Sequence, residues 1–166
     1  EAIYPLIVFL NAIPIIAIAP ILVVIFGTDI TARLIIVTLI AFFPIMVATA
    51  SGILDTPEEM LDLARVAGAS PLTEILTVRL PHAVAFIFGG LRIGVTVAVV
   101  GAVVAEFVNA NKGLGFLVTS STAQFAIPTA MACVVMLALI SVLLYEGVNL
   151  VHRTFFSWSL RREAGE

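Results

Sequence analysis

The residues able to do chemistry in this chain are few, and many of them gather in one short segment. Of the 166 residues, 11% are charged and 61% are hydrophobic, and five of the eleven acids lie between positions 55 and 74. His82 and His152 are the side chains whose ordinary titration falls near neutral pH. Neither belongs to a Ser-His-Asp arrangement or stands at metal-ligand spacing, so we expect no enzyme activity, no bound cofactor and no metal.

Three further charges, Arg92, Glu106 and Glu146, lie within or beside long apolar runs. A charge inside the hydrocarbon of a membrane is costly, so it is expected to be paired or to have a function. Arg92 lies well inside its run, and two interpretations remain open for it. It is either a structural anchor or ion pair, or a group that acts directly on a solute.

Candidates for a solute pathway are polar, charged and proline residues that interrupt the apolar runs. In the first run Asn11 is the one strongly polar side chain, and Pro14 removes a backbone donor and frees a carbonyl. Freed groups are tolerated in a membrane only where a neighbouring helix or water satisfies them. A kinked packing helix would explain the same pattern, so both explanations stand. The pathway candidates are Asn11, Pro14, Arg92, Glu106 and Asn109.

The elements that must position these residues are membrane helices. The mean hydropathy is +1.20, and a soluble domain of this size would leave about a third of its unfolded-chain surface exposed to water. We therefore expect an all-α, polytopic helical bundle with the lipid bilayer as its solvent, forming a single transmembrane domain over residues 1–166. Four runs are long enough to cross about 30 Å of hydrocarbon: 4–26, 32–53, 82–105 and 123–151.

A polar segment, residues 55–81, separates the second and third runs and is predicted to fold as two short helices. Thr56 can cap the first helix, and Glu59 three residues later completes a capping box. Gly68 is a suitable residue to end that helix. Ser70, which precedes a proline, is expected to start the second helix in the same manner.

The first of these two helices is predicted to have a charged face and an apolar face. Spacings of three and four residues place Glu58, Asp62 and Arg65 together on one side. The apolar set on the other side is Met60, Leu63, Ala64 and Ala67. At the far end of the segment, Pro81 is expected to separate the second helix from the next span.

Basic residues are unevenly divided between the two sides of such a bundle. With four spans, the polar segment and the tail 152–166 lie on one face, and the loop 106–122 lies on the other. The first face carries Arg65, Arg79, Arg153, Arg161 and Arg162, whereas the second carries Lys112 and, at its border, Arg33. Because basic residues favour the cytoplasmic side, we expect the polar segment and the tail in the cytoplasm and the loop outside.

The polar segment resembles the EAA loop of permease subunits in binding-protein-dependent ABC importers, which has the pattern E-A-A-x3-G-x9-I-x-L-P. Residues 62–64 (Asp-Leu-Ala) take the place of E-A-A, Gly68 follows at the family spacing, and residues 78–81 (Val-Arg-Leu-Pro) end the pattern. Leu63 is the one clear departure, and it leaves the fine packing of that helix open.

Three other stretches look like the nitrate/taurine/sulfonate branch of these permeases: IPIIAIAPILVVIFG, FFPIMVATASG and AEFVNANKGLGFL. The similarity therefore covers nearly the whole chain. Members of the family have more spans than the four counted here, so the resemblance implies two further N-terminal spans before Glu1.

The resemblance implies a permease subunit in a bacterial-type plasma (inner) membrane. A periplasmic or lipid-anchored binding protein would deliver a small solute, and a dimeric cytoplasmic ABC ATPase would hydrolyse the ATP. A second permease chain, most simply another copy of this one, would complete the pathway. The residues implied in coupling to the ATPase are Glu58, Asp62, Ala64, Arg65, Gly68 and Pro81. Internal helix packing is the alternative explanation for these residues.

A different class of function also fits the composition: an ATP-independent secondary transporter or channel, in which Arg92, Glu106 and Glu146 would handle ions directly. Such a protein would not need a capped cytoplasmic helix pair. Co-purification with an ATPase separates the two classes. Nucleic-acid binding is disfavoured, because the polar segment is acidic on balance and phosphate contact requires clustered lysine and arginine.

Overall fold

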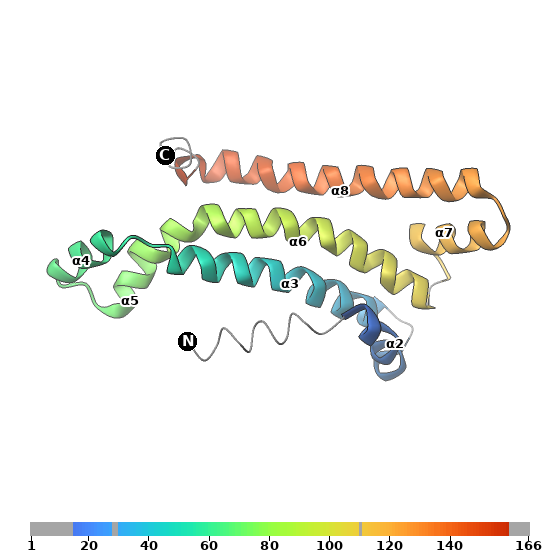
Figure 1. Ribbon diagram of the computed structural model, residues 1–166, viewed down its shortest axis with the longest axis horizontal. Coiled ribbons are helices and arrows are strands. Elements are labelled where there is room, and N and C mark those ends of the chain that lie inside the picture. Colours follow the sequence, from blue (N-terminus) through green and yellow to red (C-terminus); the bar gives the residue numbers. More distant parts are fainter. Residues whose placement is uncertain (1–14, 28–29, 110, 160–166) are drawn as a thin grey trace. The chain divides into compact units, whose positions relative to one another are not determined.

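The structure, a computed structural model, describes residues 15–27, 30–109 and 111–159. All regular secondary structure within these ranges is helical, which agrees with the expected all-α fold. In chain order the elements are α2 (Ile15–Phe26), α3 (Ile30–Leu54), α4 (Glu58–Val66), α5 (Pro71–Glu74), the π-helix η1 (Ile75–Arg79), α6 (Leu80–Asn109), α7 (Leu114–Ala123) and α8 (Ile127–Phe155) (Figure 1).

Three stretches of helix among the described residues are long and apolar enough to cross a membrane. They are Ile30–Leu54, Pro71–Val108 and Ile127–Phe155. The first two contain the expected spans 32–53 and 82–105, and the third contains most of 123–151. The other expected span, 4–26, lies outside the described residues up to position 14, and its described part is the twelve-residue α2. The described residues thus have the helices of a multi-pass membrane protein, with three candidate spans.

Most of the apolar surface of these three stretches is left uncovered by the chain itself. In the most hydrophobic part of each stretch, only 11%, 22% and 11% of the residues are buried. Leu143 of α8 and Ile93 of α6 are examples of large apolar side chains that remain more than half exposed. Such a surface needs lipid or another protein chain as its neighbour, because water would oppose it.

Packing divides the chain into two compact units, and the first comprises Glu1–Phe43 and Val95–Leu143. The core of its described part is formed by Ala19 of α2, Ile36 of α3 and Ala105 of α6, each at most 1% exposed. Leu22, Ile40 and Val104 pack against this core. Alanine in two of the three core positions allows helix backbones to approach closely.

The second unit comprises Pro44–Gly94 and Leu144–Glu166, so it contains the whole polar segment. Within this unit α3 and α6 make close contact through Gly90. A Cβ atom built on Gly90 would lie 2.7 Å from the Cβ of Ala48, nearer than real side chains come to each other. The small side chain of Ala48 and the glycine at position 90 therefore allow the two helices to pack closely here.

Candidate functional site

The polar segment begins where α3 ends, and Thr56 completes that end instead of starting α4. Its buried hydroxyl donates a hydrogen bond to the carbonyl oxygen of Ile53 at 3.0 Å. The N-cap of α4 is Pro57, with ψ 135°, and no side chain caps it among the described residues. The predicted capping box of Thr56 and Glu59 is therefore wrong, because the last carbonyls of α3 compete for the same hydroxyl. Glu58 and Glu59 still favour the first turn through the helix dipole.

The C-terminal end of α4 follows the prediction made for Gly68. This residue has φ 79°, a backbone conformation that glycine adopts without steric cost. Its N–H donates to the carbonyl of Arg65 at 2.9 Å, and the N–H of Ala69 donates to the carbonyl of Ala64 at 3.0 Å. These two bonds form a Schellman motif, which stops the helix and reverses the chain. A Cβ at position 68 would meet no atom of the described residues within 4 Å.

The second helix of the segment starts at Ser70, as expected, but it is not a separate helix. The Ser70 hydroxyl accepts a hydrogen bond from the N–H of Thr73 at 3.2 Å. Helix α5 then continues through η1 directly into α6. Measured from Pro71 to Val108, this helix has 38 residues, or roughly 57 Å at about 1.5 Å per residue, against about 30 Å of hydrocarbon. A polar extension of the span thus takes the place of the expected independent helix.

Pro81 lies inside this long helix and does not mark its boundary, which corrects the sequence-based expectation. The N–H of Leu80 bonds to the carbonyl of Ile75, five residues earlier. Such a π-type bond widens the turn directly before the proline. Because a proline ring in a regular helix collides with the carbonyl four residues earlier, the wider turn gives the helix room to continue.

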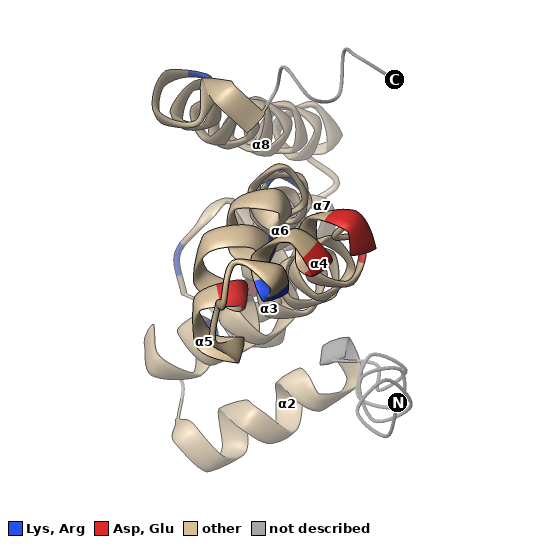
Figure 2. Ribbon diagram, turned by 90° about the vertical axis from the view of Figure 1, so that its left-hand side faces the viewer, with Lys and Arg blue, Asp and Glu red and all other residues tan. Residues whose placement is uncertain are grey.

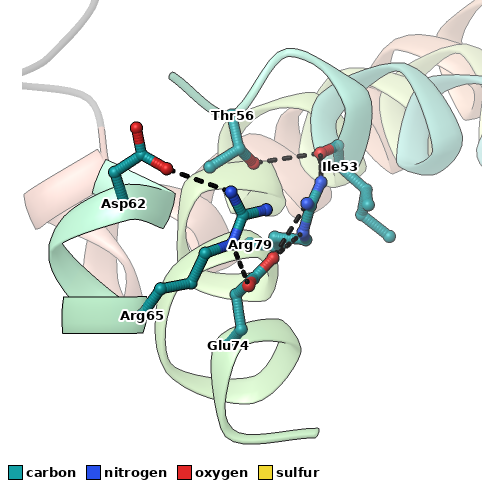
Figure 3. Close-up of polar contacts among 6 residues, drawn as sticks. All are labelled: Ile53, Thr56, Asp62, Arg65, Glu74 and Arg79. Atoms are coloured by element: carbon teal, nitrogen blue, oxygen red, sulfur yellow. Dashed lines mark hydrogen bonds and ion pairs between the residues drawn. The ribbon is translucent and has the colours of Figure 1, made fainter. Parts of the chain in front are cut away.

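Glu74 is the centre of a chain of ionic contacts that joins α4 to the start of the long helix (Figure 3). On one side the Arg65 Nη1 atom lies 3.0 Å from the Asp62 Oδ1 atom, and the Arg65 Nε atom lies 3.4 Å from the Glu74 Oε2 atom. On the other side Arg79 lies 2.8 Å from Glu74. Arg79 also donates a hydrogen bond to the carbonyl of Ile53 at 3.4 Å, which links the chain of contacts to the end of α3. We call these five residues the brace.

The brace determines geometry more than it adds stability. Its outer pair is open to water, with the side chains of Arg65 and Asp62 53% and 67% exposed. Its inner pair is better shielded, at 23% for Arg79 and 13% for Glu74. Exposed ion pairs contribute roughly 0–1 kcal/mol each. The prediction that Asp62 and Arg65 share one face of α4 agrees with their contact.

Only some of the residues on the predicted apolar face of α4 are shielded from water. Leu61, which the sequence analysis did not single out, is the buried side chain that anchors this helix, at 4% exposed. Ala64 is half-buried, whereas Leu63 and Val66 are 72% and 87% exposed. In a nine-residue helix with apolar residues on several sides, spacing alone does not identify the inner one. The exposed leucine and valine are apolar side chains that α4 leaves uncovered within the described residues.

Charged residues gather at this part of the molecule. Figure 2 shows acidic residues in red on α4 and α5, with basic residues in blue close by, whereas the long helices are largely uncoloured. The polar segment is thus a charged element with an exposed apolar surface, built at the end of two apolar helices.

The candidate pathway residues lie in different parts of the chain. Asn11 and Pro14 are outside the described residues. Asn109 is the last residue of α6. Glu106 accepts a hydrogen bond from the N–H of Gly115 at 2.6 Å, at the start of α7. The expected loop 106–122 therefore consists of the last turn of α6, a short connection and α7, and Glu106 holds the two helices together.

Arg92, the remaining candidate, contacts His152 rather than standing alone in its helix. The Arg92 Nη2 atom lies 2.6 Å from the His152 Nδ1 atom, and the His152 Nε2 atom lies 2.8 Å from the Ser159 hydroxyl. The Phe88 ring stacks on His152 at a centroid distance of 4.3 Å. From the sequence, Glu146 was a possible partner of His152 or Arg153, and neither Arg92 nor Ser159 was expected beside His152. No local spacing connects Arg92 to His152, because they are sixty positions apart.

The sequence is similar to known proteins along nearly its whole length. The family described as binding-protein-dependent transport system inner membrane component matches residues 1–157. A probable ABC transporter permease protein of Haemophilus influenzae is 41% identical over 94% of this chain. The riboflavin transport system permease protein of Chloroflexus aurantiacus is 34% identical over 95% of it, and the taurine transport system permease protein of Escherichia coli is 30% identical over 93% of it.

These relatives are longer than this chain. The matched part covers 63% of the Haemophilus influenzae protein, 59% of the Chloroflexus aurantiacus protein and 56% of the Escherichia coli protein. The chain therefore spans about three fifths of the length of the relatives that it matches.

Proposed function

Because the chain belongs to the family of inner membrane components of binding-protein-dependent transport systems, we propose that it is the permease subunit of an ATP-driven importer. It forms a transmembrane pathway for a small solute, which a periplasmic or lipid-anchored binding protein delivers. A separate dimeric ABC ATPase hydrolyses the ATP and meets the polar segment. The chain itself supplies no catalytic group and binds no cofactor.

The observation that carries this proposal is the construction of the polar segment. On its inner side, the brace fastens α4 to the long helix and to the end of α3. Leu63 and Val66 of the same segment are exposed, and among the described residues nothing lies within 4 Å of a Cβ built on Gly68. A rigid element with an uncovered apolar surface suits a docking partner, because a force applied there reaches the membrane helices instead of bending a loop.

The coupling residues take two kinds of role in this proposal. Ala64 and Gly68 permit close approach of the ATPase, because neither presents a large side chain. Glu58, Asp62 and Arg65 are exposed charges of α4 and are proposed to contact the ATPase beside these small residues. Pro81 lies in the helix that passes motion from the segment into the membrane.

The polar segment and the C-terminal tail are proposed to lie in the cytoplasm of a bacterial-type cell, and the chain in its plasma membrane. A second copy of this chain is proposed to complete the pathway. Asn11, Pro14, Glu106 and Asn109 remain predicted pathway residues. The names of the relatives include riboflavin and taurine, so the solute is proposed no more narrowly than a small molecule.

The test uses two glycines with nearly the same φ, 79° for Gly68 and 81° for Gly27. A Cβ added to either one would meet no atom of the described residues within 4 Å. Gly68→Trp and Gly27→Trp therefore carry a similar conformational cost. In the full-length protein, Gly68→Trp should abolish co-purification with the ATPase and substrate-dependent ATP hydrolysis, while membrane insertion persists. Gly27→Trp should retain both. ATP-independent transport by Gly68→Trp at the wild-type rate would establish the secondary transporter or channel instead.

A further inference from the structure

The end of α8 and the residues up to Ser159 are attached to α6 by a buried and partly buried cluster, which we call the tail clamp. It consists of Phe88 and Arg92 from α6, with His152, Phe156 and Ser159 from the C-terminal side. All five belong to the second compact unit, which also contains the polar segment.

The hydrogen bonds of the tail clamp run in one direction. Arginine has no acceptor, so Arg92 donates to the Nδ1 atom of His152. The imidazole then carries its hydrogen on Nε2 and donates it to the Ser159 hydroxyl. Ser159 in turn donates to the carbonyl of Phe156 at 2.8 Å. The Nε2–H of His152 and the hydroxyl of Ser159 are thus each matched to an acceptor, which fixes the tautomer of His152 and the rotation of the Ser159 hydroxyl.

The tail clamp is also closely packed. His152 is 1% exposed and Ser159 is 3% exposed. The ring of Phe88 stacks on the imidazole with an angle of 1° between their planes. The ring centroids of Phe88 and Phe156 are 5.1 Å apart. Removing Arg92 would leave a buried imidazole nitrogen without this donor, and the loss of a buried partner costs more than the loss of an exposed one.

The helix that carries Arg92 is the same helix that carries half of the brace. Arg79 binds Glu74 and the carbonyl of Ile53. Arg92 follows thirteen residues later, about 20 Å along the helix axis at about 1.5 Å per residue. The helix is unbroken between them. A displacement of the polar segment along this helix therefore reaches the tail clamp without passing through a loop.

We propose that Arg92 is a positioning residue that fastens the C-terminal segment, residues 152–159, to the helix of the polar segment, so that both move together when the ATPase acts. This decides between the two interpretations of Arg92: the guanidinium serves as an anchor and does not act on the solute. The attachment stands on the contacts alone, whereas the joint movement rests on the proposed function.

The attachment is tested by hydrogen–deuterium exchange of the full-length protein, assembled with its ATPase in lipid nanodiscs. In Arg92→Met and His152→Leu, the amides of residues 152–159 should exchange at least about tenfold faster than in the wild type. Local opening of this segment then no longer has to break the tail clamp. The double variant should exchange no faster than His152→Leu, because without His152 the contact to Arg92 is already lost. Ser159→Ala, a milder change, should give a smaller increase. The matched control is Arg153→Met, because Arg153 neighbours His152 but is exposed. Unchanged exchange in Arg92→Met and His152→Leu would overturn the attachment.

The joint movement is tested in the same samples by adding magnesium, ATP and orthovanadate. In the wild type, exchange should change in both residues 58–80 and residues 152–159. In Arg92→Met, only residues 58–80 should respond. A response of both segments in Arg92→Met would refute the positioning role. A chain that never binds the ATPase would refute the proposed function, and the exchange of residues 152–159 without nucleotide would still decide the attachment.

Discussion

Glu106 and Gly115 are joined by a 2.6 Å hydrogen bond that fixes the start of α7 against the end of α6. The Glu106 carboxylate fills the space beside two glycines. A Cβ on Gly115 would lie 2.9 Å from the Oε2 atom of Glu106, and a Cβ on Gly113 would collide with the same carboxylate. Gly113 also has φ 122°, where other residues are strained. The glutamate therefore requires both glycines in order to reach the helix.

The first prediction concerns this bond. Glu106→Leu leaves the buried N–H of Gly115 without its acceptor, which should destabilise the folded protein by about 1–3 kcal/mol. Glu106→Gln keeps an acceptor oxygen and should lose less. Gly113→Ala should resemble Glu106→Leu, because the methyl group displaces the carboxylate. Thermal unfolding in detergent, followed by loss of monodispersity, measures the order of these variants.

Gly147→Ala is the control for this series, because a Cβ at that helical position meets no described atom within 4 Å. It should be neutral or slightly stabilising, as alanine favours a helix over glycine. Equal stability of Glu106→Leu and Glu106→Gln would show that the hydrogen bond does not hold α7.

The second prediction compares two adjacent glycines in α6. A Cβ on Gly90 would lie 2.7 Å from the Cβ of Ala48 and 3.1 Å from the Cα of Ile45. A Cβ on Gly89 would meet nothing within 4 Å in the part of the chain that the structure describes. Gly90→Ala should therefore force α3 and α6 apart, at a cost of about 1–3 kcal/mol. Gly89→Ala should leave the melting temperature of the detergent-purified protein unchanged or raise it.

A compensating variant makes this prediction sharper. Ala48→Gly removes the nearest obstructing atom, so it should partly restore the stability of Gly90→Ala. The rescue should remain incomplete, because the backbone of Ile45 stays in place. If Gly89→Ala and Gly90→Ala lower the melting temperature equally, the loss comes from helix flexibility and not from the contact.

The third prediction concerns the brace. Glu74→Gln removes the charge shared by Arg65 and Arg79, so α4 should detach from the long helix more often. An interaction of about 1 kcal/mol changes the open fraction about fivefold. Trypsin should therefore cut after the exposed Arg65 several times faster in Glu74→Gln than in the wild type. Glu59→Gln is the control, since Glu59 is an exposed acid on α4 outside the brace. Equal cleavage rates in the two variants would mean that the brace does not hold α4.

The features that could be predicted from the sequence are those with local causes. Gly68 ends α4 because a chain reversal at that point needs positive φ, and Ser70 starts the next helix because its hydroxyl reaches the N–H of Thr73. The expected spans 32–53 and 82–105 lie inside helices because a long apolar run has no other stable form in a membrane. The first part of the family pattern has the same local cause, since the spacing from residues 62–64 to Gly68 runs from α4 to the turn that ends it.

The predictions that were wrong concern residues whose conformation also depends on a neighbouring element. The Thr56 hydroxyl lies between α3 and α4, and it bonds to the Ile53 carbonyl of α3 instead of capping α4. Pro81 has a strong tendency to end a helix, but the π-type turn before it removes the clash. Leu61 is the buried residue of α4, and the spacing of apolar residues within α4 does not identify it.

By itself the sequence determined that this protein is helical, that its solvent is a bilayer, and that a polar segment with a defined turn interrupts its spans. These follow from hydropathy and from residues close together in the chain. Only the tertiary structure decided that Arg92 meets His152, that Glu106 needs Gly113 and Gly115, and that Glu74 links two arginines across the polar segment. Partners for buried charges come from other elements, and their choice depends on which helix surfaces come together, a property that no local pattern records.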